Sequence, residues 1–121
     1  MNLSHKTTKY NKYLLPIKYT EDSLNRKEIF FTETQIRLLK NNGELIKSIV
    51  ITSKKIVDSC YGLDFQITQY GVLFLNKDDI EINNNKLILN YSFSIPFTDL
   101  GKAIKFSFDL VTFKEQVFID P

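Results

Sequence analysis

"KLILNYSFSI", residues 86–95, is the stretch that decides the fold. Its side chains fall into two alternating sets, and one of the sets is apolar throughout. A repeat of two residues with one apolar set is typical of a β-strand that buries one face, so we expect a strand here. The residues of the buried face are Leu87, Leu89, Tyr91, Phe93 and Ile95, and those of the other face are Ile88, Asn90, Ser92 and Ser94.

The same pattern returns in "AIKFSFDL", residues 103–110. Each apolar side chain buried by such a strand contributes ~1.5–3 kcal/mol of gross stabilisation, which chain entropy largely offsets. These two strands are therefore expected to form the base of the core. The expected inward residues are Ile104, Phe106, Phe108 and Leu110, and the outward ones are Lys105, Ser107 and Asp109.

A hairpin is predicted directly before the first strand, in "DDIEINNNKLIL". A two-residue loop at Asn84-Asn85 places Ile82 opposite Leu87, and asparagine tolerates the positive φ that such a loop needs. It also places Ile80 opposite Leu89, and a slip by one residue would break both apolar matches.

Three further strands are predicted on either side of this ribbon. "DFQITQ" (64–69) and "GVLFLN" (71–76) read as two strands joined through Tyr70-Gly71, with Gly71 as a bulge or tight bend. "FKEQVFI" (113–119) reads as a closing strand.

Residues 32–43 fit two structures. One is a helix that Thr32 would cap and that would end at Gly43. The other is a hairpin through "KNNGE", with Gly43 in the left-handed position and Lys40 facing Glu44. We favour the hairpin because the chain after it reads as β. "SKKIVDSCYG" (53–62) fits either a strand or a short helical turn.

The predicted fold class is therefore all-β, an antiparallel β-sandwich or a jelly-roll-like barrel. We expect roughly eight short strands, with room for one short helix within 33–60. The chain has 121 residues, of which 43% are hydrophobic, and this is enough for one domain with a real core. We assign that domain to residues 13–121, behind a flexible basic N-terminal tail at 1–12.

The front end, "HKTTKYNKYLLPIKYT" (5–20), raises the question of nucleic-acid binding, since it holds four lysines and no acid. Read as a strand, residues 12–19 place Tyr13 and Tyr19 on one face and Lys12 and Lys18 on the other. A grip on single-stranded nucleic acid needs rings and cations on one surface. The formal net charge of the chain is also only +2. We therefore expect an edge strand, which Pro16 and the lysines suit.

The candidate docking residues belong to this front end. A basic tail ahead of an edge strand can dock on a neighbouring subunit by strand addition, or contact phosphate. The partners expected are protein subunits of a larger assembly, as a homo- or hetero-oligomer, with nucleic acid less favoured and no membrane. The candidate docking residues are Lys6, Lys9, Tyr10, Lys12 and Lys18.

No catalytic or metal-binding set is visible in the sequence. The only histidine is His5, and the only cysteine, Cys60, reads as a small core or rim residue. One Cys and one His cannot build a zinc site. The acids Asp78, Asp79 and Glu81 lack calcium-loop spacing and read as a solvated hairpin end. We expect no enzyme, no cofactor and no metal.

Three functions are compatible with these observations. The leading one is a non-enzymatic structural or interaction subunit, by fold-level analogy a phage virion component such as a capsid accessory protein, a head–tail joining protein or a tail or baseplate adaptor. The second is a small-ligand or glycan-binding module using the loop "PFTDLGK" (96–102), with Phe97 and Asp99 as contacts. The third is a nucleic-acid-contacting or inhibitor protein that acts through the basic N-terminus.

The expected location follows from the hydropathy. No apolar run approaches the ~18–20 residues that cross a bilayer, and "YLLPI" is too short for a signal peptide. We expect a soluble protein made in the cytoplasm, with incorporation into a virion under the leading hypothesis.

Overall fold

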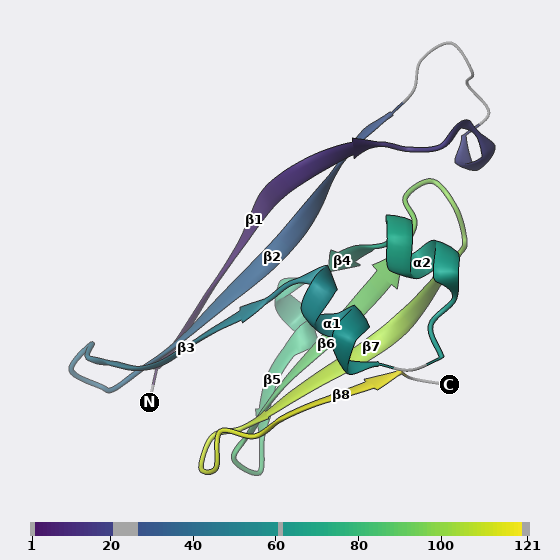
Figure 1. The fold of residues 1–121 in the computed structure, drawn as a ribbon. Helices are drawn as coiled ribbons and strands as arrows, with labels where there is room; N and C mark the ends of the chain where they lie inside the picture. The colour runs from purple at the N-terminus through teal and green to yellow at the C-terminus, as the bar shows by residue number, and fades with distance from the viewer. Residues whose placement is uncertain (1, 21–26, 61, 120–121) are drawn as a thin grey trace.

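The computed structural model describes residues 2–20, 27–60 and 62–119, which form two antiparallel sheets (Figure 1). The first sheet has the order β1-β2-β3. The second has the order β4-β6-β7-β8, and β5 also pairs with β6. The prediction of an all-β sandwich is confirmed. The strands are β1 (Asn2–Leu14), β2 (Glu28–Leu39), β3 (Leu45–Ile51), β4 (Val72–Phe74), β5 (Ile80–Asn83), β6 (Lys86–Ser94), β7 (Gly101–Asp109) and β8 (Glu115–Ile119).

Four short helical elements complete the described residues. Two are 3-10 helices, η1 (Ile17–Tyr19) and η2 (Lys77–Asp79), and two are α-helices, α1 (Ser53–Ser59) and α2 (Phe65–Tyr70). Of the two structures expected for 53–62, the helical one forms, and α1 lies inside the 33–60 window. Its start is capped by Thr52, whose hydroxyl accepts a hydrogen bond from the Lys55 amide at 3.1 Å.

The core lies between the sheets and joins side chains of both. The inward faces predicted for 86–95 and 103–110 are buried, except that Leu110, which follows the end of β7, is half-buried. Tyr91 brings a polar group into this core. Its hydroxyl lies buried without a hydrogen bond of good geometry to the described residues. Burial raises the pKa of Tyr91 to about 12, and the neighbouring Thr34 side chain offsets a part of this effect.

Both predicted hairpins are confirmed. Asn84 and Asn85 have φ of 51° and 61°, and Ile82 pairs with Leu87 as expected. At the other hairpin the Lys40 amide donates to the Glu44 carbonyl at 2.8 Å, and Gly43 has a φ of 89°. The helix considered for 32–43 does not form, because alternate residues of β2 and β3 face the core and a helix would turn a part of them to solvent.

The prediction of a strand at 64–69 was wrong, since most of it is helix α2. The Asp64 carboxylate caps this helix and accepts from the Gln66 amide at 2.8 Å. A strand would place Phe65 and Ile67 on one buried face. In the structure Ile67 is buried, whereas Phe65 is 75% exposed. Gly71 ends the helix where it passes Phe93, and an added Cβ would lie 2.5 Å from the phenylalanine ring.

The front end needs two corrections. Residues 2–12, expected as a flexible tail, lie in β1, which pairs with β2 from Asn2 opposite Leu39 to Leu14 opposite Glu28, with a bulge at Asn11. The expected strand over 12–19 is wrong, because β1 ends at Leu14 and the chain enters η1 after Pro16. The pairing was missed because most of β1 is exposed, and its sequence therefore lacks an apolar alternation.

Candidate functional site

β1 is a long strand at the margin of its sheet (Figure 1). Within the described residues only β2 pairs with it, so its other edge is open. Lys6, Lys9 and Lys12 lie exposed along it, and the strand contains no acidic residue. An open edge presents a row of backbone donors and acceptors to which another strand can pair. On β1 these unpaired backbone groups lie beside three exposed lysines.

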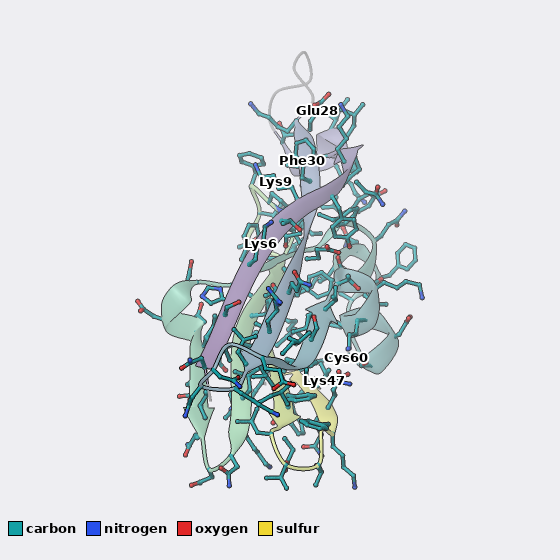
Figure 2. The ribbon with its side chains drawn as sticks, turned by 90° about the vertical axis from the view of Figure 1, so that its left-hand side faces the viewer. Lys6, Lys9, Glu28, Phe30, Lys47 and Cys60 are labelled. Atoms are coloured by element: carbon teal, nitrogen blue, oxygen red, sulfur yellow. The ribbon has the colours of Figure 1, made fainter. Side chains whose placement is uncertain are left out.

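The structure separates the five candidate docking residues into two groups. Lys6, Lys9 and Lys12 share the open strand, and Figure 2 shows the first two along β1. Tyr10 is half-buried, and its hydroxyl lies 3.5 Å from that of Ser53 at the start of α1. Lys18 lies outside β1, in η1, with its ammonium 5.0 Å from the centroid of the Tyr19 ring. The three lysines of β1 follow the same open strand, with Lys9 and Lys12 on one face, opposite Thr32 and Phe30, and Lys6 on the other face, opposite Gln35.

The tyrosines of the front end hold β1 in place. Tyr13 stacks on Phe31 at 4.8 Å between centroids, and its hydroxyl donates to the Tyr70 carbonyl at the end of α2. Tyr19 donates to the Gln66 side chain on the same helix. Burial raises the pKa of Tyr13 to about 12, with a further contribution from the neighbouring tyrosines. These rings face the protein, as the sequence predicted, and leave the lysines at the surface.

Beside Lys9 the surface is hollowed by about 280 Å³, and the most prominent apolar side chains around the hollow are three phenylalanines. They come from three segments far apart in the chain: Phe30 from β2, Phe74 from β4 and Phe97 from the loop before β7. Their exposed fractions are 40%, 45% and 68%. A hydrogen bond of 2.7 Å from the Thr32 hydroxyl to the Leu73 carbonyl ties β2 to β4 beneath them. We call these three residues the Phe triad.

The charges at this hollow come from β1 and β2. The Lys9 ammonium lies 5.5 Å from the centroid of the Phe30 ring. Figure 2 shows Lys9, Phe30 and Glu28 toward the same end of the hairpin. Glu28 lies 3.7 Å from the Lys12 ammonium, so its charge is partly matched. Lys9 and Glu28 thus both line the hollow, and the Lys9 ammonium lies over one ring of the Phe triad.

Phe97 is held in an unusual backbone conformation. The Thr98 amide donates to the Ile95 carbonyl at 3.3 Å, which closes a four-residue turn with Pro96 second and Phe97 third. Phe97 has a φ of 64°, and the third position of such a turn normally takes glycine or asparagine. The Thr98 hydroxyl also donates to the Ile95 carbonyl at 2.8 Å, which stiffens the turn. A bulky residue is thus kept in a left-handed conformation and largely in solvent.

The other residue expected in this loop points elsewhere. Asp99 lines a separate, more open hollow of about 410 Å³, together with Lys102 and the serines of β6. The structure therefore does not bring Phe97 and Asp99 together around one ligand. Phe30 and Phe74 were not predicted as partners of Phe97, because only the packing of β2 against β4 places them there.

The groups considered for chemistry stay apart from this surface. Cys60 is half-buried beside β8, and burial raises the pKa of its thiol, which favours the unreactive protonated form. The Asp79 carboxylate accepts from the Asn76 amide at 3.1 Å, which gives it a structural role. No group of three or more metal-ligating side chains occurs in the described ranges 2–20, 27–60 and 62–119.

Comparisons with known proteins identify no relative. A scan against models of protein families, a search of curated proteins and a search of solved structures each found no match. Among the described residues, no helix has the length and apolar character to span a bilayer.

Proposed function

We propose that this protein is a non-enzymatic interaction subunit that docks in a larger assembly through the open edge of β1. The observation that carries the proposal is a strand of 13 residues with one free edge, three lysines and no acid. A partner strand that pairs with this edge gains main-chain hydrogen bonds along its length.

The charge on β1 points to a partner of a different sequence. Two copies of β1 paired with each other would bring several lysines together without any acid to match them, and like charges opposite one another destabilise a strand pair. An acidic strand meets no such penalty and is steered toward the edge. The partner we propose is therefore an extended segment rich in Glu or Asp.

For the biological setting, we propose a phage virion, as a capsid accessory, head–tail joining or tail or baseplate protein. The support is a β-sandwich with an open edge strand, which is a fold-level analogy. The test is the native mass of the complex recovered from the source of the protein. Multiple copies in a ring or shell are expected, and a free monomer with no particle component attached would contradict this setting.

The docking edge is tested with defined peptides. We expect a fluorescein-labelled peptide of alternating Glu and Val to bind, and a peptide of alternating Lys and Val to bind at least tenfold more weakly. The triple variant Lys6→Glu, Lys9→Glu, Lys12→Glu should reverse this preference. The matched control, Lys47→Glu, Lys102→Glu, Lys114→Glu, makes the same change in charge at exposed positions outside β1 and should keep it.

Two outcomes would overturn the proposal. One is that neither peptide binds. The other is that binding maps to another edge, such as β8, when backbone amide shifts are followed by NMR. A nucleic-acid function would give a third pattern: binding of a single-stranded oligonucleotide that falls steeply between roughly 50 and 200 mM salt.

A further inference from the structure

We propose that the Phe triad is the seat for one bulky apolar side chain of the acidic segment that pairs with β1. This inference rests on the proposed function and specifies its partner further. The partner then has two features: acidic residues that match the lysines of β1, and an anchor residue at one end.

No ring contact among the described residues explains why Phe97 is exposed and left-handed. It is 68% exposed, it takes part in no ring pair among the described residues, and its left-handed conformation is unfavourable for a side chain of its kind. Strained residues that neighbouring hydrogen bonds hold in place are concentrated at binding and catalytic sites.

Phe113 is a second phenylalanine with a left-handed backbone, and it differs from Phe97 in its packing. Phe113 also has a positive φ, of 60°, but it stacks on Phe108 with 5.7 Å between centroids. Packing therefore accounts for Phe113, whereas no ring within 2–20, 27–60 and 62–119 pairs with Phe97. In the proposed complex, the side chain that completes the surroundings of Phe97 comes from the partner segment.

The size of the hollow selects the occupant. Sites for drug-sized ligands measure ~300–1,000 Å³ and enclose most of the ligand. The hollow beside the Phe triad measures about 280 Å³ and is open to solvent, which suits one aromatic or large aliphatic side chain. Pockets that receive a single such side chain are common centres of protein–protein interfaces.

Lys9 links the hollow to the open edge. Its backbone belongs to β1, opposite Thr32 of β2, and its side chain lines the hollow over Phe30. A segment paired with β1 thus passes the hollow near Lys9, toward the C-terminal end of the strand. An acidic residue of the segment would draw the Lys9 ammonium away from the Phe30 ring and uncover the apolar surface.

The experiment adds a Trp anchor to the Glu-Val peptide and measures how its position changes the affinity. Two further peptides carry Trp at the N-terminal or at the C-terminal end. Because the hollow lies toward one end of β1, we expect only one of them to bind more tightly, by roughly tenfold to a hundredfold. Phe97→Asn should abolish this gain, so that the Trp peptides bind this variant no more tightly than the plain Glu-Val peptide does. The control is Phe65→Ala, which removes a more exposed phenylalanine outside the hollow and should leave the gain intact.

The outcomes separate the two proposals. If the plain Glu-Val peptide binds and neither Trp peptide gains affinity, the anchor site is refuted and the docking edge stands. If both Trp peptides gain equally, or the gain survives Phe97→Asn, the Phe triad is not the seat. If the plain peptide does not bind, the docking edge itself fails. Circular dichroism of each variant confirms that the comparison is made on folded protein.

Discussion

Replacing Phe97 with Asn should leave the stability of the fold almost unchanged, although it removes a large apolar side chain. The left-handed backbone at this position costs a residue other than Gly or Asn about 1 kcal/mol, and Asn relieves it. Full burial of a phenylalanine contributes up to ~3 kcal/mol. At 68% exposure Phe97 has only about a third of that contribution to lose, roughly 1 kcal/mol. The two effects nearly cancel.

The matched variant is Phe113→Asn, which gives the same relief at a φ of 60°. Phe113 is 43% exposed and therefore loses a little over half of the burial contribution, about 1.5 kcal/mol. It also loses its stacking on Phe108, a contact of the kind that contributes about 0.5–1.5 kcal/mol. We expect Phe113→Asn to be destabilised by about 1–2 kcal/mol relative to Phe97→Asn.

The assay is urea unfolding of both variants and the parent protein, followed by circular dichroism at 25 °C. The comparison between the two variants removes the backbone contribution that they share. Equal losses, or a larger loss for Phe97→Asn, would show that Phe97 packs within the fold. The exposure of Phe97 would then give no support for a partner site.

Other predictions concern the core and its pH dependence. Tyr91→Phe removes a buried hydroxyl without a good partner, so unfolding in urea should require about 1 kcal/mol more, and a loss of stability would show that Thr34 does bond it. Tyr13 and Tyr91 have pKa values of about 12 in the fold against 10.0 ordinarily. Since the unfolded chain ionises first, the contribution of these two tyrosines to stability should be constant below about pH 10 and fall between about pH 10 and 12. The fall over that range should be less steep in Tyr91→Phe, and a midpoint of unfolding that stays constant from about pH 10 to 12 would contradict this. Gly71→Ala places a Cβ 2.5 Å from the Phe93 ring, so we expect a loss of about 1–3 kcal/mol in thermal or urea unfolding, and an unchanged midpoint would refute the close approach.

Several elements could be predicted because neighbouring residues encode them. The alternation in β6 and β7 shows which side chains are buried, and the asparagines at 84 and 85 supply the positive φ that a short loop needs. Gly43 does the same for the hairpin between β2 and β3. At each of these places the local preference and the tertiary contacts favour the same structure.

Other elements could not be predicted, because their apolar spacing is weak or fits a helix and a strand equally well. Residues 64–69 are too short to separate a helix from a strand by their apolar spacing, and the Asp64 cap decides in favour of the helix. The sequence of β1 shows little apolar alternation because most of its side chains face solvent. Its strand conformation is instead supported by backbone pairing with β2. β1 lies at the end of its sheet, where most of its side chains face solvent and one edge is unpaired. Its sequence is therefore polar and resembles that of a disordered tail.

The sequence by itself determined that this protein is all-β, since alternating apolar residues are buried together when sheets face one another, but it left a sandwich and a jelly-roll-like barrel open. It also indicated that Lys12 and Lys18 lie at the surface while Tyr13 and Tyr19 turn inward. Only the tertiary structure decided that Lys6, Lys9 and Lys12 follow an open edge and that Phe30, Phe74 and Phe97 surround one hollow. The physical reason is that exposed side chains contribute little to folding, so their grouping depends on how distant segments pack and leaves no periodic trace in the chain.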